Sequence, residues 1–200
     1  MIDEGYTKYA CDWHRSPALP NALVAELNDW RNRLYDAGLV GYYPGQGVGF
    51  GNLSIRVGKK GRFIISGTQT GHIPRLDEAH YSLVTAYDID GNRVTCEGPV
   101  QASSEALTHA GVYALDKGIC GIAHVHNLSL WNAWKEKAPT TARDVPYGTP
   151  EMAWEFQRLY RETDFAGIGV AVMAGHAGGI VAFGDSIGQA ARRILALAVD

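Results

Sequence analysis

The sequence predicts a mixed α/β protein in which a mainly antiparallel sheet is covered by helices. Helical periodicities flank runs of short strands and do not alternate strictly with them, which is typical of antiparallel sheets with helices on their faces. The strand-like segments also come in adjacent pairs joined by short turns, which favours hairpins. The length of 200 residues and the even composition predict one domain over residues 1–200.

The first half begins with a helix over residues 20–37 and continues as strands. Apolar residues recur at helical spacing at Leu23, Leu27, Trp30 and Leu34. The glycine density of residues 41–51 excludes a helix there. The elements expected next are strands over 53–57 and 62–66 around a turn at 58–61, a helical or turn segment over 74–78, and a strand pair over 81–98 around the turn Asp90-Gly91-Asn92.

The second half alternates helices and strands more regularly. Ser103 or Ser104 is expected to cap a helix that runs to about Asp116. Pro150 is a typical first residue of a helix, which should run to about Arg161. The other expected elements are a strand over 119–127, a helix over 128–136, a loop over 139–147, a strand pair over 169–175 and 179–184, and a closing helix over 186–199.

Charge and cysteine content exclude several classes of protein. The formal net charge is −3 with both signs interspersed, so no basic patch indicates nucleic acid. No uncharged apolar run approaches the length of a membrane-spanning helix, and the first residues lack the pattern of a signal peptide. The odd, widely spaced cysteines Cys11, Cys96 and Cys120 favour reduced thiols. We expect a cytoplasmic protein without a nucleic-acid or membrane partner.

The stretch Ile122–Asn127, "IAHVHN", places two histidines one residue apart in an apolar run. On a strand, His124 and His126 point to one face and Val125 points to the other. Two imidazoles on one pleat can share a metal ion. The alternative is a pair of unrelated histidines on a partly buried strand, and only a third ligand would favour the metal site.

Two further stretches supply candidates. In Ser103-Ser-Glu-Ala-Leu-Thr-His109, Glu105 falls in the first turn of a helix, where the helix dipole favours a carboxylate, and it shares a face with His109. The local sequence alone favours a simple capping arrangement. His176 lies in a glycine-rich turn between two expected strands, and its alternative role is that of a surface turn residue.

Six short stretches occur in an order that resembles the class II aldolase/adducin family. They are GNLSIR (51–56), FIISGTQTG (63–71), EGPVQASSE (97–105), IAHVHN (122–127), YGTPE (147–151) and GHAGGIVAFG (175–184). The family includes fuculose-phosphate and rhamnulose-phosphate aldolases and ribulose-phosphate 4-epimerases. The matches span roughly residues 45–190, which is most of the chain.

The resemblance implies a three-layer α/β/α fold with a largely antiparallel central sheet, usually assembled as a homotetramer with active sites at subunit interfaces. It also implies a Zn²⁺ site, or one for another divalent metal such as Mn²⁺ or Co²⁺, with His124, His126 and His176 as ligands. Glu105 matches the acid/base glutamate of the family. If burial raises its pKa, Glu105 can move a proton in catalysis.

The resemblance further implies that a substrate phosphate is bound by small polar residues, namely Asn52, Ser66, Gly67, Ser103 and Ser104. The residue types agree with this role, because glycine-rich loops and helix N-termini present N–H donors to anions. A carboxylate would fit the same donors. Within these motifs Arg56 is the one cationic candidate.

The sequence departs from the family pattern at three places. His176 lies two residues farther from the glycine that opens the last strand than the family's histidine does. The loop over residues 131–147 is shorter than its usual counterpart, which often carries a tyrosine or an acidic residue. Because the sequence stops soon after the last expected helix, we also expect no C-terminal tail of the kind that closes some family sites. The proton donor therefore stays open, with Tyr147 and His72 as candidates.

The resemblance implies a metal-dependent aldolase-type lyase that cleaves a small phosphorylated hydroxy-carbonyl compound through a zinc-stabilised enediolate. An epimerase or dehydratase on the same site is one alternative. A non-catalytic, adducin-like interaction module is another. The joint presence of His124, His126 and Glu105 favours catalysis, because a scaffold has no physical need for them.

Overall fold

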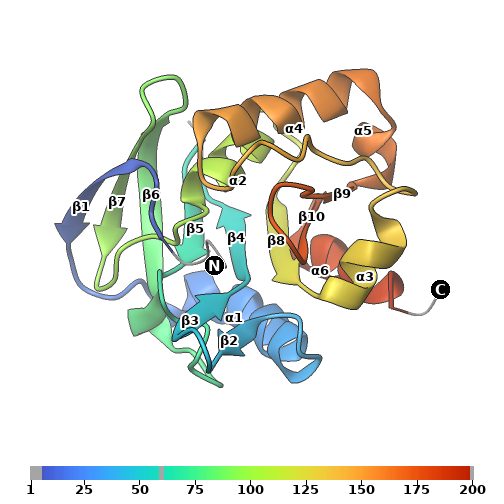
Figure 1. Ribbon diagram of the computed structural model, residues 1–200. Helices are drawn as coiled ribbons and strands as arrows, with labels where there is room; N and C mark the ends of the chain where they lie inside the picture. Colours follow the sequence, from blue (N-terminus) through green and yellow to red (C-terminus); the bar gives the residue numbers. More distant parts are fainter. Residues whose placement is uncertain (1–5, 59–60, 199–200) are drawn as a thin grey trace.

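The computed structural model describes residues 6–58 and 61–198, and its centre is one large sheet (Figure 1). Among these residues the strand order is β1-β7-β6-β5-β4-β8-β10-β9. The strands are β1 (Ala10–Arg15), β4 (Asn52–Arg56), β5 (Phe63–Ser66), β6 (Tyr81–Asp88), β7 (Arg93–Gly98), β8 (Gly121–His126), β9 (Val170–Val172) and β10 (Gly179–Gly184). Every neighbouring pair is antiparallel except β1 and β7, which run parallel. The expectation of a largely antiparallel sheet is thus confirmed.

Helices cover both faces of this sheet and make three layers (Figure 1). The helices α2 (Ala106–Tyr113), α4 (Pro150–Glu162) and α5 (Phe165–Ile168) pack on one face, and α1 (Asn21–Asp36) and α6 (Ile187–Ala196) pack on the other. Alternate residues of β5 serve the two cores: Phe63 and Ile65 face α2 and α4, whereas Ile64 faces α1 and α6. This arrangement is the expected α/β/α fold.

Several helix boundaries agree with the sequence. The helix α1 ends just before Gly38, which adopts a positive φ of 70°. The helix α4 begins at Pro150, and the Oγ1 atom of Thr149 accepts a hydrogen bond from the backbone of Met152. The helix α6 begins after Ser186, whose Oγ accepts from the backbone of Gln189 at 3.2 Å. The end expected for α6, Val199, lies outside the described residues.

The helix α2 is shorter than expected, and its first residue differs. It begins at Ala106 with Glu105 at the N-cap, so neither Ser103 nor Ser104 occupies that position. The Oγ of Ser103 instead accepts a hydrogen bond from the backbone of Glu105 and shapes the turn before the helix. At the other end the helix stops at Tyr113, whose carbonyl accepts from the guanidinium of Arg56.

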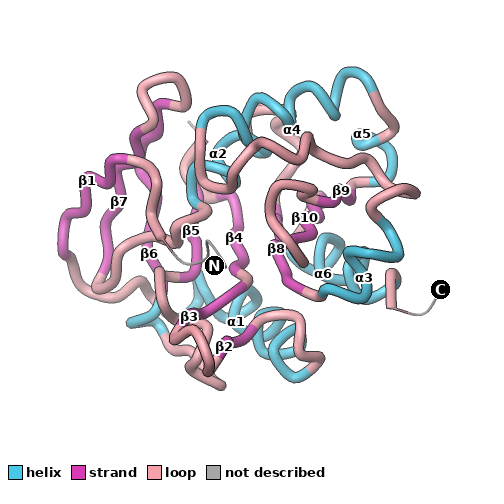
Figure 2. The backbone as a smooth tube through the Cα atoms, in the orientation of Figure 1, coloured by secondary structure: helices cyan, strands magenta, loops and turns pink. Residues whose placement is uncertain are grey.

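Other expected elements are present with small shifts. The helix α3 (Leu128–Trp134) ends two residues early, and the segment expected over 74–78 gives way to a 3₁₀ helix, η1 (Glu78–His80). Figure 2 shows the loop that connects α3 to α4, as expected over residues 139–147. The turn expected at 58–61 includes residues 59–60, which lie outside the described part of the chain.

Four short elements were not anticipated. They are β1, the two-stranded sheet of β2 (Gly41–Tyr43) and β3 (Val48–Phe50), and α5. The strand β1 is mostly exposed, so it lacks the apolar alternation that marks a half-buried strand. It forms because its backbone pairs with β7, far along the chain. None of the helices in residues 6–58 and 61–198 is long and apolar enough to cross a membrane.

Candidate metal centre

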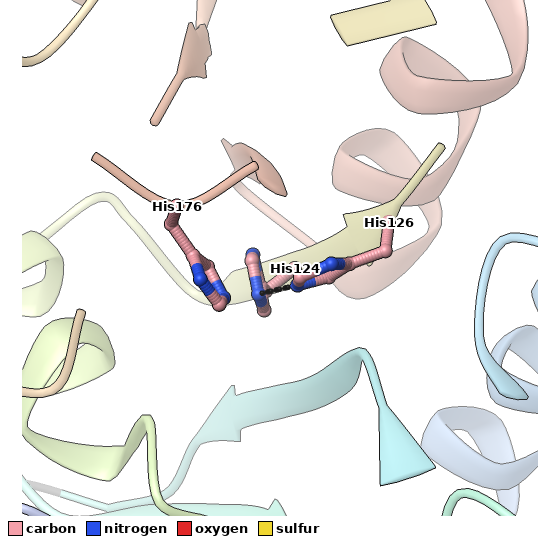
Figure 3. Close-up of side chains that lie close together, drawn as sticks. All are labelled: His124, His126 and His176. Carbon is pink, nitrogen blue, oxygen red and sulfur yellow. Dashed lines mark hydrogen bonds between the residues drawn. The ribbon is translucent and has the colours of Figure 1, made fainter. Parts of the chain in front are cut away.

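Three histidines from two separate segments meet on one face of the sheet (Figure 3). His124 and His126 lie on β8, and His176 lies in the turn between β9 and β10. Each offers one ring nitrogen to a common point, and these nitrogens all lie within 4.8 Å of one another. All of the side chains are buried. Such a group of imidazoles is a typical site for a divalent transition metal.

The alternation of β8 explains the first two positions. Ala123 and Val125 of this strand pack into the core under α1 and α6, whereas Ile122 packs into the core under α2 and α4. Side chains of a strand point alternately to its two faces, so His124 and His126 follow Ile122 toward α2 and α4. The same-face expectation for the two histidines is confirmed.

The conformation of a glycine turn brings in the third histidine. The backbone of His176 donates to Met173 O, and its carbonyl accepts from Gly179 N at 2.8 Å. Gly178 has a φ of 85°, which favours glycine, and a Cβ atom at Gly179 would lie 2.8 Å from the His176 ring. The two additional residues before the last strand are therefore accommodated in a tight turn, which points the imidazole of His176 toward β8.

The protonation of the histidines suits metal binding. Nδ1 of His124 lies 3.2 Å from the carbonyl of Ile180, which can only accept, so Nδ1 carries the hydrogen and Nε2 keeps a lone pair. Burial, the largest cause, lowers the pKa of His124 to about 4, and burial with the neighbouring histidines lowers the pKa of His126 well below its ordinary value. Both rings are therefore neutral near pH 7, as a metal ligand must be.

A buried carboxylate adjoins this cluster. Oε1 of Glu105 lies 3.1 Å from Nε2 of His176 and 3.5 Å from Nε2 of His124. Burial by itself raises the pKa of Glu105, but His124 and His176 outweigh it and hold the pKa at about 2. The condition considered for Glu105, a pKa raised by burial, is therefore not met, because the histidines lie so close. Glu105 is thus a carboxylate at neutral pH.

A small polar pocket lies beside the cluster, where β4 begins, β5 ends and α2 begins. Its lining residues are all small or polar: Gly49, Gly51, Asn52, Gly67, Thr68, Gln69, Thr70, Gly71, Ser103 and Ser104. Asn52 pairs in register with His124, which places the pocket next to the histidines. Oδ1 of Asn52 is buried and has no hydrogen-bond partner among the described residues. A buried polar atom of this kind is suited to a ligand.

Four of the five expected anion-binding residues line this pocket, namely Asn52, Gly67, Ser103 and Ser104. Ser66 does not, because it lies within β5 and its Oγ accepts from the backbone of Leu53. Pocket residues 68–71 were not among the expected anion-binding residues, although they fall within the stretch FIISGTQTG that carries the resemblance.

Arg56 lies away from the pocket lining. Its guanidinium donates to the backbone carbonyls of Tyr113, Asp116 and Ile119, which is the region where α2 ends. Within residues 6–58 and 61–198, the pocket lining thus contains neither Arg nor Lys.

The two candidate proton donors, Tyr147 and His72, differ in their positions relative to the histidine cluster. The Tyr147 ring is buried and packs on His176, with ring centroids 4.4 Å apart. Its hydroxyl accepts from the backbone N–H of Tyr6 at 3.0 Å and donates to the Tyr6 carbonyl, so Tyr147 holds His176 in place from outside. His72 is exposed, and its Nδ1 donates a hydrogen bond to the carbonyl of Gln69.

Comparison with known proteins places this architecture among characterised folds. A family model described as "Class II Aldolase and Adducin N-terminal domain" matches residues 32–199. A comparison with curated protein sequences finds no match.

Several solved structures share the fold. L-fuculose-1-phosphate aldolase from Thermus thermophilus superposes with a TM-score of 0.63 at 21% identity, covering 89% of this chain and 90% of that one. A sugar-phosphate aldolase from Thermotoga maritima gives a TM-score of 0.66 at 16% identity, covering 88% and 90%. YgbL from Escherichia coli, a "putative aldolase/epimerase/decarboxylase", gives 0.63 at 20% identity, covering 88% and 85%. At sequence identities of 16–21%, the structural similarity shows only that the fold is shared.

Proposed function

Because the chain belongs to the class II aldolase and adducin N-terminal domain family, we propose that it is a metal-dependent aldolase-type lyase. The proposed reaction cleaves a carbon–carbon bond in a small phosphorylated hydroxy-carbonyl compound. The observation that carries the proposal is the contact between an ionised buried carboxylate, Glu105, and the three-histidine cluster. An interaction module would have no use for this costly group of buried polar side chains.

The donor set fits a divalent metal. Two ring nitrogens, Nε2 of His124 and Nε2 of His126, lie 3.0 Å apart with both rings neutral, and His176 completes the group. Imidazole ligands suit Zn²⁺, with Mn²⁺ and Co²⁺ as alternatives. When bound, such a metal supplies Lewis acidity, which polarises a substrate carbonyl and stabilises negative charge that develops on its oxygen.

Glu105 carries the proton transfer in this proposal. Its pKa of about 2 means that it begins as a proton acceptor at neutral pH. In the direction of carbon–carbon bond formation, the carboxylate removes a proton from the carbon beside the carbonyl. In the direction of cleavage, the carboxylate first accepts the proton that the cleaved hydroxyl loses as it becomes a carbonyl. The carboxyl group then delivers this proton to the carbon beside the other carbonyl. General acid–base catalysis of this kind requires the acceptor beside the reacting group, and Oε1 already adjoins the cluster.

The polar pocket holds the substrate phosphate in this proposal. Asn52 offers the N–H donors of its side-chain amide, and Ser103 and Ser104 offer their hydroxyls. The backbone N–H of Gly67 already donates to the His80 carbonyl, so Gly67 contributes space for the phosphate and no side chain. The pocket adjoins the histidines through the pairing of Asn52 with His124, so one small molecule can reach both. The names of the similar aldolases, which act on fuculose 1-phosphate or sugar phosphates, support a phosphorylated substrate. Membership of the family supports a homo-oligomer.

A turnover screen tests the proposal. The metal-loaded protein is incubated with phosphorylated and unphosphorylated hydroxy-carbonyl compounds, and both carbonyl fragments of a cleavage are measured. Cleavage that a chelator abolishes and added metal restores is the expected result. Isomers of the substrate would indicate an epimerase, and loss of water would indicate a dehydratase. Protein that neither binds metal nor turns over any compound would indicate an interaction module and overturn the proposal.

A further inference from the structure

Two cysteine thiols that the sequence separates widely lie in contact at the edge of the sheet. Sγ of Cys11 on β1 and Sγ of Cys96 on β7 are 3.8 Å apart, and both are free thiols in the structure. The parallel pairing of β1 and β7 sets Cys11 opposite Val94, two residues before Cys96. A disulfide has a sulfur–sulfur distance of about 2.05 Å, so rotation of the two side chains covers most of the gap.

The two thiols differ in accessibility and in acidity. Cys96 is fully buried, whereas Cys11 is partly exposed and open to a small oxidant. The hydrogen bond from Cys11, the largest cause, lowers the pKa of Cys96 to about 7, and the backbone of Ala102 helps. The same hydrogen bond raises the pKa of Cys11, so the thiolate forms on Cys96 with the Cys11 thiol beside it. A substantial part of the pair therefore carries a thiolate near neutral pH, and the thiolate is the reactive form.

The pair lies next to the segment that enters the polar pocket. The backbone of Ala102 hydrogen-bonds Cys96, and Ala102 directly precedes Ser103 and Ser104 of the pocket. From the other strand, the hydroxyl of Tyr9, two residues before Cys11, donates to the Ser103 carbonyl at 2.7 Å. The family model begins matching at residue 32, so the strand that carries Cys11 is outside the matched region.

We propose that Cys11 and Cys96 are a redox-modification site, at which a hydroperoxide converts the dithiol to a disulfide that a thiol reductant reverses. One thiolate attacks the O–O bond, forms a sulfenic acid and releases water or an alcohol. The sulfur of the second thiol then attacks the sulfenic sulfur and forms the disulfide bond. The hydroxyl group of the sulfenic acid takes up the proton of that thiol and leaves as water. Two thiols are oxidised, and one peroxide is reduced, in each turn.

The disulfide ties the edge strand to β7 beside the pocket. A bridge between residues so far apart in the sequence restricts the unfolded chain strongly. We therefore expect the oxidised protein to melt roughly 5–10 °C above the reduced protein, and dithiothreitol should remove the difference. An oxidised protein that melts lower than the reduced one would show that the folded structure does not accommodate the bridge.

Peptide mapping tests the pairing directly. The full-length, metal-loaded protein is treated with increasing hydrogen peroxide, blocked with an alkylating reagent and digested with trypsin without reduction. Trypsin places the three cysteines in separate peptides, residues 9–15, 94–117 and 118–135. The expected product links peptides 9–15 and 94–117, and dithiothreitol releases it.

Matched variants make the outcome specific. Cys120→Ser removes a thiol that lies just before β8, separated from β7 by β6, β5 and β4 in the sheet, and should leave the linked peptide unchanged. Cys11→Ser removes the partly exposed thiol and should abolish the linked peptide. Oxidation of the two cysteines to separate sulfinic acids, or a linked peptide that contains Cys120, would overturn the inference.

Discussion

Nε2 of His124 lies 3.0 Å from Nε2 of His126, on two buried and neutral imidazole rings (Figure 3). Nδ1 of His124 already donates to the carbonyl of Ile180, so its Nε2 presents a lone pair. Two such atoms facing one another need either a shared hydrogen or a cation between or beside them. With His176 in the same cluster, a divalent cation is the group that best satisfies all three rings.

We predict that the purified protein carries about one divalent metal per chain. His126→Ala removes one of three ligands and should lower the metal content far below that ratio, while circular dichroism shows a folded chain. His14→Ala, an exposed histidine on β1, is the matched control and should keep the metal. Elemental analysis measures both, and full metal retention by His126→Ala would refute the assigned site.

We predict that Glu105→Gln keeps the metal and loses most of the turnover. The amide has nearly the same shape as the carboxylate but cannot accept the proton, and removal of a general acid/base costs on the order of 10²–10⁴ in rate. The control is Glu97→Gln, because Glu97 is an exposed carboxylate on β7. If Glu105→Gln turned over at a rate near that of the wild type, the residue would be merely the N-cap of α2.

We predict that Asn52→Ala raises KM and leaves kcat little changed. Its side chain lines the polar pocket, which in the proposal holds the phosphate and not the reacting carbons, so its loss removes binding that substrate and transition state share. Inorganic phosphate, at concentrations on the order of millimolar, should compete with substrate for the same donors. Asn132→Ala on exposed α3 serves as control. An unchanged KM together with no inhibition by phosphate would indicate an unphosphorylated substrate.

We predict that Tyr147→Phe retains the metal affinity and Tyr147→Leu lowers it roughly tenfold or more. The ring supports His176 through a face contact with centroids 4.4 Å apart, and supporting residues of metal ligands commonly contribute about 10- to 100-fold in affinity. Competition with a chelator of known affinity measures the effect. Equal affinity of the two variants would show that the ring contact does not orient His176.

We predict that the metal-free protein loses stability as the pH falls from about 6.5 to 4.5. Burial lowers the pKa of His109 to about 3, that of His124 to about 4, and that of His126 well below the ordinary 6.5. Between these values the unfolded chain binds the proton and the folded chain does not, so each histidine costs about 1.4 kcal/mol per pH unit. Above pH 6.5 neither state is protonated, and the contribution is constant.

Thermal melts at several pH values check this prediction, and His109→Gln should reduce the slope by about a third, since one of the three histidines with a lowered pKa is removed. Gln keeps a hydrogen-bonding group for Ser54, which contacts His109 at 2.7 Å. His14→Gln, at an exposed position, should leave the slope unchanged. A slope that is the same in His109→Gln and wild type would contradict the depressed pKa of His109.

The sequence by itself determined the local geometry. The alternation of "IAHVHN" placed His124 and His126 on one face, since successive strand residues point to opposite sides whatever surrounds them. The apolar spacing of residues 20–37 and Pro150 located two helices to within a residue or two. The six resembling stretches and their order along the chain indicated the family. The family in turn implied the three-layer fold.

The tertiary structure decided what depends on contacts between distant segments. It alone showed that the turn at Gly178 places His176 beside β8 and that β1 pairs with β7 at the edge of the sheet. It also showed that the guanidinium of Arg56 donates to the carbonyl at the end of α2. Finally, it showed that the histidines lower the pKa of Glu105 although the carboxyl group is buried. The physical reason is common to all of these. Electrostatic and packing energies depend on distances through space, and a sequence specifies only distances along the chain.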